Sequence, residues 1–128
     1  MHKTFLILGS STAAIAVVLG AFGAHALKDR LAPEQLQVFE TGVRYQVYHS
    51  FALILVALLA AKYSSLTLNY SGFLFLSGII FFSGSLYLLS MKSLLGIEHW
   101  KFLGPITPLG GLCFVTGWIL VAVSAWKQ

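Results

Sequence analysis

The sequence predicts an all-α integral membrane protein, a four-helix bundle forming a single membrane domain over residues 1–128. Hydrophobic residues make up 58% of the 128 residues and charged residues only 9%, whereas a soluble domain usually carries about 25% charged residues. A chain this short cannot enclose so many apolar side chains in one core, so the excess must face lipid. Four stretches also reach the roughly 20 apolar residues that a membrane-spanning helix needs, namely 5–27, 43–61, 70–91 and 108–126.

The first stretch, 5–27, follows His2 and Lys3 and ends in the small residues of GAFGAHA. A secretory signal peptide has similar flanks. The apolar run here is longer than the roughly 7–15 residues of a signal peptide. We therefore expect this segment to be retained as a transmembrane helix.

The second stretch, 43–61, is preceded by a segment with helix signals of its own. Pro33 suits the first position of a helix, and Glu34 suits the positive first turn. Apolar residues then recur at helical spacing, which predicts an interfacial amphipathic helix over about 33–42. A continuous helix from Pro33 to Ala61 would be about 44 Å long, against a hydrocarbon layer of about 30 Å. Its first turns are therefore expected to lie outside the hydrocarbon.

The third and fourth stretches, 70–91 and 108–126, carry no charged residue. At the start of the fourth, Thr107 is predicted to cap the helix and Pro108 to occupy its first turn. Helices in lipid gain little from burying apolar groups, so small residues that let backbones approach should mark the contacts. Such residues recur at four-residue intervals in the first stretch and at seven in the third and fourth, and seven suits a left-handed bundle. The candidate packing residues are Gly20, Ala24, Gly78, Ser85, Gly110 and Gly117. The second stretch shows no such ridge and is expected to face lipid more.

Four spans put both termini on the same side of the membrane. The opposite side carries five Lys and Arg against three and also holds all four acids, so by a small margin it is the side expected in the cytoplasm. The basic residues form no patch with interleaved aromatics, which excludes nucleic acid as a partner. The expected partners are the lipid bilayer and, within it, further copies of the chain or other membrane proteins. The single Cys113 provides no disulfide framework.

Polar side chains concentrate where the second span begins, and ionisable residues within membrane segments are candidates for function. Glu40 and Arg44 are four apart in the order that favours a helical ion pair. The candidate polar site or structural network consists of His25, Glu40, Arg44, Tyr45, Gln46, Tyr48 and His49.

Three interpretations of these residues remain open. One is a metal site drawing on His25, His49 and His99 with Glu98 or Glu40, although no HxxxH or HExxH spacing supports it and no metal or other cofactor is expected. Another is a proton or substrate relay through a histidine. The third is a polar belt, in which Arg44 reaches the headgroups and His49 bonds a backbone carbonyl of another helix. Whether Arg44, Tyr48 and His49 face inward or outward separates these interpretations.

Catalytic motifs are missing from the sequence. It contains no GxSxG, no closely spaced carboxylate pair and no glycine-rich phosphate loop, so we do not expect an enzyme. The leading hypothesis is a non-enzymatic membrane component, either an interaction partner or a subunit of an oligomer. The alternative is a small channel or carrier for an ion, proton or small molecule, with its entrance near Glu40, Arg44 and His49. Arg44→Ala and His49→Ala are both expected to destabilise the bundle, because each leaves a polar partner unpaired.

Four local strings, taken together, resemble a known family. GAFGAHALK, FETGVRYQVYHS, FSGSLYLL and GPITPLGGLCFVTGW occur here in the order found in the small multi-pass membrane proteins catalogued as domain of unknown function 423, with YgdD-like and YwdK-like bacterial members. The resemblance implies a four-helix protein of the bacterial cytoplasmic (inner) membrane and no particular reaction. The family's polar motif corresponds to His25, Tyr45, Gln46, Tyr48 and His49. Its terminal motif corresponds to Gly104, Pro105, Thr107, Pro108, Gly110 and Gly111.

Overall fold

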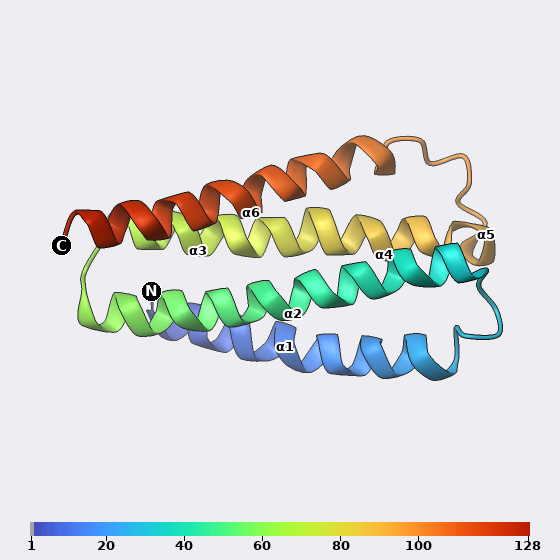
Figure 1. The fold of residues 1–128 in the computed structure, drawn as a ribbon, viewed down its shortest axis with the longest axis horizontal. Coiled ribbons are helices and arrows are strands. Elements are labelled where there is room, and N and C mark those ends of the chain that lie inside the picture. Colours follow the sequence, from blue (N-terminus) through green and yellow to red (C-terminus); the bar gives the residue numbers. More distant parts are fainter. Residues whose placement is uncertain (1) are drawn as a thin grey trace.

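The computed structural model describes residues 2–128, and this part of the chain is helical without a strand. The elements are α1 (His2–His25), α2 (Pro33–Lys62), α3 (Leu66–Gly78), the π-helix η1 (Ile79–Ser83), α4 (Gly84–Ser90), α5 (Lys92–Leu95) and α6 (Leu103–Trp126). α3, η1 and α4 form one continuous rod, so four helices are long and apolar enough to cross a membrane (Figure 1). The predicted all-α membrane bundle is confirmed.

Local chemistry explains several helix ends. Pro33 takes the first position of α2, where a missing backbone N–H costs nothing. At the start of α3 the backbone N–H of Leu68 donates to Ser65 Oγ at 3.3 Å, which is a side-chain cap. α5 ends at Leu95, and the next residue, Gly96, caps it with a φ of 68°, in the left-handed region that favours glycine.

The start of α6 and the segment before the second span differ from the prediction. α6 begins at Leu103, so Pro108 lies inside the helix and Thr107 does not cap it. The Thr107 hydroxyl instead lies 2.6 Å from Ser85 Oγ, which joins α6 to α4. The expected interfacial segment 33–42 is helical, but it is the first part of α2 and not a separate element. Gly42 lies inside this helix, which continues past it without a break.

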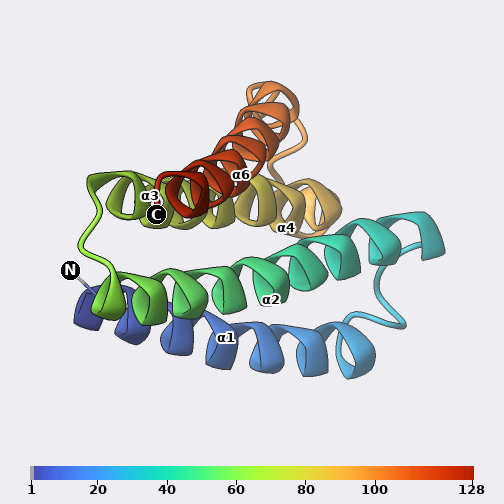
Figure 2. The same cartoon turned by 60° about the vertical axis from the view of Figure 1, so that its left-hand side comes forward.

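α2 is the central helix of the bundle. It runs antiparallel to α1 on one side and contacts α3, η1 and α4 on the other, while α6 packs against α3 and η1 (Figures 1 and 2). A larger share of α2 is buried than of any other span. The expectation that the second span faces lipid more than the others is therefore wrong. The third span lies between α2 and α6.

Buried positions recur every seven residues in all four spans, as in a left-handed bundle. The series are Gly9, Ala16 and Gly23 in α1, Phe39, Gln46 and Leu53 with Gly42, His49 and Val56 in α2, Ser71, Gly78 and Ser85 in the third span, and Gly110, Gly117 and Ser124 in α6. Four predicted packing residues, Gly78, Ser85, Gly110 and Gly117, thus lie in helix contacts. Ala24 is exposed, and a Cβ added at Gly20 would lie at an ordinary contact distance from Val43. The line of small residues predicted in α1 at four-residue intervals therefore differs from the buried line, which runs through Gly9, Ala16 and Gly23.

Aromatic rings fill the space that the buried glycines leave. A Cβ added at Gly23 would lie 2.9 Å from the Phe39 ring, and one at Gly117 would lie 2.7 Å from the Phe75 ring. The other glycine–ring pairs are Gly42 with Tyr87, Gly72 with Phe5 and Gly78 with Phe114. In lipid, where apolar burial gains little, this fit of a ring onto a flat helix surface supplies the attraction between helices.

The π-helix η1 lies at the level where the third span meets α6. Its last turn closes by a bond from the Gly84 N–H to the Ile79 carbonyl, five residues back, which accommodates one extra residue. Within residues 2–128, Ser83 Oγ is buried without a hydrogen-bond partner. A hydroxyl left unpaired inside the bundle costs stability, and it sits at this irregular turn.

Candidate functional site

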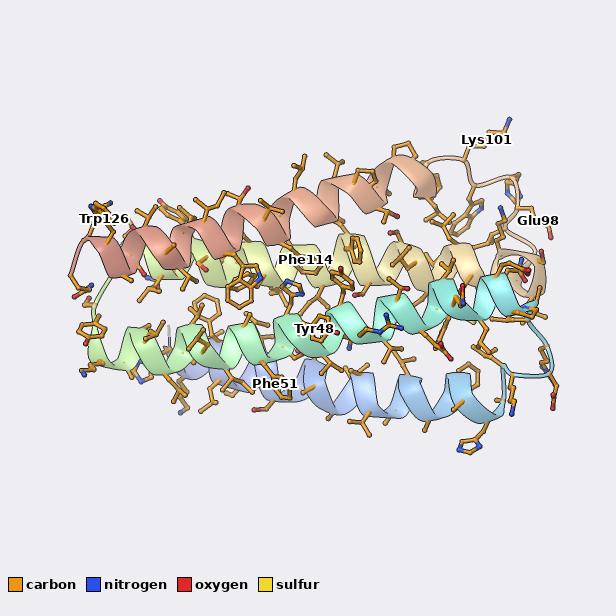
Figure 3. All side chains as sticks on the ribbon, in the orientation of Figure 1. Tyr48, Phe51, Glu98, Lys101, Phe114 and Trp126 are labelled. Atoms are coloured by element: carbon orange, nitrogen blue, oxygen red, sulfur yellow. The ribbon has the colours of Figure 1, made fainter. Side chains whose placement is uncertain are left out.

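The buried polar side chains gather near the middle of the bundle. Thr12, close to the halfway point of α1, is hydrogen-bonded to Gln46 and Ser50 of α2. Figure 3 shows Tyr48 midway between the end that carries Glu98 and Lys101 and the end that carries Trp126. The sequence predicts that the second span enters the membrane at its polar residues, and their position in the bundle does not agree with that. Gln46 and His49 lie near its centre.

Gln46 joins three helices through both ends of its side-chain amide. Its Nε2 donates to the Thr12 carbonyl of α1 at 2.8 Å, and its Oε1 accepts from the Tyr87 hydroxyl of α4 at 2.6 Å. The Ser50 hydroxyl lies 2.8 Å from Thr12 Oγ1 and 2.6 Å from the Gln46 carbonyl. Gln46 is only 4% exposed, so this network holds the α1–α2 pair to α4.

We expect Gln46→Met to lower the free energy of unfolding by about 1–2 kcal/mol, because the Tyr87 hydroxyl loses its buried acceptor. The volume is kept, so packing changes little. Equilibrium unfolding in detergent measures the effect, with exposed Gln37→Met as the matched control. Adding Tyr87→Phe to Gln46→Met should recover part of the loss. A fully additive double variant would contradict the proposed bond.

His49 forms a second centre, between α2 and α6. Its Nδ1 lies 2.7 Å from the Tyr45 carbonyl, and its Nε2 lies 3.1 Å from Trp118 Nε1. A carbonyl only accepts and an indole N–H only donates, so Nδ1 carries the proton and the imidazole is neutral. The ring stacks on Phe114 with centroids 3.5 Å apart and planes 9° apart. The carbonyl belongs to His49's own helix, which corrects the expectation of another helix.

The other predicted site residues lie on the surface. Glu40, Arg44 and His25 are exposed, and Tyr45 and Tyr48 are 38% and 50% exposed. No salt bridge joins Glu40 to Arg44, or any other pair in the part of the chain described, so the expected ion pair is not formed. The predicted set thus divides into a buried pair, Gln46 and His49, and an outward-facing group.

The structure does not support the metal interpretation. In residues 2–128, no group of three or more His, Cys, Asp or Glu side chains is placed to hold a metal ion. His49 is buried, whereas His25 and His99 are exposed in other parts of the bundle. The three histidines therefore do not form a site.

Several partners of the buried pair are not predicted by the sequence. They are Thr12, Ser50, Tyr87, Phe114 and Trp118. One signal was available, because Gln46 and Ser50 are four apart and so share a helix face. The partners on other helices had none, since a lone Thr or Trp in an apolar span also occurs in lipid-facing positions.

Two surface grooves flank Tyr48. One, of about 530 Å³, lies between α2, η1 and α6 and is lined by aromatic rings together with His49. In Figure 3, Phe114 of α6 and Tyr48 of α2 lie at about the same position along the length of the bundle. The other groove, of about 350 Å³, lies between α1 and α2 and is lined by Gly20, Gly23, Glu40 and Arg44.

Comparison with known proteins assigns the family. The family described as "Protein of unknown function (DUF423)" matches residues 19–111. The chain belongs to this family. It is 46% identical to UPF0382 membrane protein YwdK of Bacillus subtilis over 98% of both chains. It is also 42% identical to a UPF0382 membrane protein of Staphylococcus aureus, over 98% of this chain and 97% of that one. No solved structure matches the chain.

Membership in DUF423 confirms the resemblance that the four sequence strings indicated. The relatives are named membrane proteins, which agrees with helices long and apolar enough to cross a membrane. The chain is therefore a membrane protein. The matched residues cover the Gln46–Tyr87 bond, but Thr12 and Trp118 lie outside them. Both polar centres thus join the part of the chain matched by the DUF423 family to helices that extend beyond it.

Proposed function

We propose that the protein is a non-enzymatic component of the bacterial cytoplasmic membrane that acts through helix contacts with a second copy or with another membrane protein. One observation carries this proposal: the buried polar groups form hydrogen bonds between the protein's own helices, while the charged groups face outward. Gln46 is bonded to α1 and α4, and His49 is bonded to α6. Glu40 and Arg44 are exposed. An acid–base or transport centre would instead leave an inward group free to meet a substrate.

The outer face formed by η1, α3 and α6 suits a helical partner. It carries a groove of about 390 Å³ lined by Phe81, Leu109, Leu112 and Cys113, among others. Phe81, Leu109 and Leu112 are each about half exposed. A concave apolar surface permits the close van der Waals contact that drives helix association in lipid.

Oxidative cross-linking at Cys113 tests this proposal, because Cys113 is the only cysteine of the chain. A disulfide requires Cα atoms of two copies within about 7 Å. We expect membrane-permeant copper phenanthroline to give a disulfide dimer in native membranes. A Cys113→Ala variant carrying Val17→Cys, on the exposed side of α1, is the matched control and should cross-link less.

A partner other than a second copy would appear as a defined adduct of Cys113, absent from the Val17→Cys control. Monomer alone from both variants, with no adduct, would contradict the proposed contact at this face. The alternative function, a small channel or carrier entered near Glu40, Arg44 and His49, makes a different prediction. It requires ion, proton or solute flux across reconstituted vesicles over a pH series, whereas the proposed function requires none.

We further propose that both termini lie on the same side of the membrane. The start of α1 and the end of α6 lie at the same end of the bundle (Figure 1). Cysteine accessibility from each side, at positions beyond Trp126 and before Phe5, tests this arrangement.

A further inference from the structure

The groove between α1 and α2 lies near one membrane surface. Gly20 and Gly23 line it on α1, a short distance before that helix ends at His25. On α2 it passes Val43, beside Gly20, and continues toward Tyr48, nearer the middle of the bundle. One end of the groove therefore lies at headgroup depth, and the other extends into the hydrocarbon layer.

Two opposite charges line this groove in a fixed order. Glu40 is nearer the start of α2, and Arg44 follows one turn deeper, about 6 Å further along the helix axis. Both side chains are exposed, and no salt bridge joins them. A guanidinium this close to hydrocarbon needs an anionic partner or access to the surface. Within residues 2–128, no acidic side chain supplies that partner.

We propose that this groove binds a zwitterionic phospholipid with a primary amine headgroup, phosphatidylethanolamine. In this lipid the phosphate lies deeper than the ammonium, and a short ethanolamine link joins them. The order matches Arg44 below Glu40. The Arg44 guanidinium donates to the phosphate oxygens, the lipid ammonium donates to the Glu40 carboxylate, and an acyl chain lies along the flat surface at Gly20.

Other phospholipids match this groove less well. The glycerol headgroup of phosphatidylglycerol has no cation for Glu40. The quaternary ammonium of phosphatidylcholine has no N–H to donate to the carboxylate. This inference goes beyond the proposed function, since a monomer can hold the lipid.

Native mass spectrometry of the purified protein, with equal amounts of the three lipids carrying identical acyl chains, measures the selectivity. We expect phosphatidylethanolamine to be retained about tenfold more than either competitor, which is the selectivity that about 1.4 kcal/mol provides. Free phosphoethanolamine, without acyl chains, should not compete. Equal retention of the three lipids would overturn the proposal.

Variants of the two charges separate the headgroup contacts. Arg44→Gln should reduce retention of all three lipids about tenfold. Glu40→Gln should abolish the preference for phosphatidylethanolamine over phosphatidylglycerol while keeping the affinity for the phosphate. Lys28→Gln removes an exposed charge outside the groove and should change neither. A Lys28→Gln effect as large as that of Arg44→Gln would show that general electrostatics, and not this groove, binds lipid.

Gly20→Leu tests the acyl-chain part of the groove. An added Cβ there meets only Val43, at an ordinary 3.5 Å, so the fold should persist while the side chain fills the groove. Gly104→Leu, where nothing lies within 4 Å of an added Cβ, is the matched control. We expect loss of lipid from Gly20→Leu alone. If Gly20→Leu does not fold, the selectivity of Glu40→Gln still decides, because that change is on the surface.

Discussion

Replacing Gly110 by alanine is expected to lower the free energy of unfolding by about 3 kcal/mol, at the upper end of the cost of overpacking a core. The new Cβ would lie 2.7 Å from Phe82 Cα and closer still to the Phe82 backbone nitrogen. A side chain can rotate away from such a clash, but backbone cannot. α6 would have to separate from η1, and the contacts around Gly117 and Phe75 would weaken with it.

Gly111→Ala provides the matched control for this change. It is the next residue of the same helix, and its added Cβ would meet only the Phe82 ring, at 3.8 Å. Both changes give the same gain in helix propensity, so their difference isolates the clash. Equilibrium unfolding of both variants in detergent should show a loss only for Gly110→Ala. Equal stabilities would show that α6 and η1 are not in backbone contact.

The second large effect is expected at His49. His49→Ala should cost about 3 kcal/mol, as for other buried aromatic side chains replaced by alanine. It removes the ring stacked on Phe114 and leaves the Trp118 indole N–H without its acceptor. Arg44→Ala, which was expected from the sequence to destabilise as well, should stay within about 0.5 kcal/mol. Arg44 is exposed and forms no salt bridge within residues 2–128.

Thermal and denaturant unfolding of both variants in the same detergent measures this contrast. His25→Ala, an exposed histidine at the end of α1, is the control for losing an imidazole. A stable His49→Ala variant would mean that His49 is kept for something other than packing. A strongly destabilised Arg44→Ala variant would mean that Arg44 has a partner inside the bundle.

The sequence predicts the spans and many contacts because both depend on local composition. Length and apolar content locate the four helices. Small residues at seven-residue spacing locate the contacts of Gly78, Gly110 and Gly117. The ridge through Ala24 was wrong because four-residue spacing selects a different helix face, and the buried line in α1 runs through Gly9 and Gly23.

The central position of α2 was not predictable in the same way. In water, an apolar face identifies the side of a helix that packs inward. In lipid both sides are apolar, so Leu53 in the core and Leu58 on the surface look alike in the sequence. α2 packs through large residues placed against other helices' glycines, as Phe39 is against Gly23. That pairing becomes visible only when the helices are placed together.

The depth predicted for the candidate site was wrong for a related reason. The close spacing of Arg44, Tyr48 and His49 in the sequence predicts one group at the membrane surface. On a helix, consecutive residues point in different directions, and only His49 and Gln46 turn inward. Their partners, Trp118 and Tyr87, come from spans far away in the sequence. The spacing of residues within one helix does not indicate which residues of the other helices they contact.

The π-helix determines the rotational phase of everything that follows it in the third span. One α-helical residue corresponds to a rotation of about 100°, so the extra residue within Ile79–Ser83 turns α4 by that amount relative to an unbroken α-helix. Deleting a residue there would regularise the helix. Ser85 and Tyr87 would then keep their places, whereas the full sequence wound as an unbroken α-helix would carry Ser85 away from Thr107 and Tyr87 away from Gln46. The irregular turn thus lets a single helix present one bonding side to α6 and another to α2.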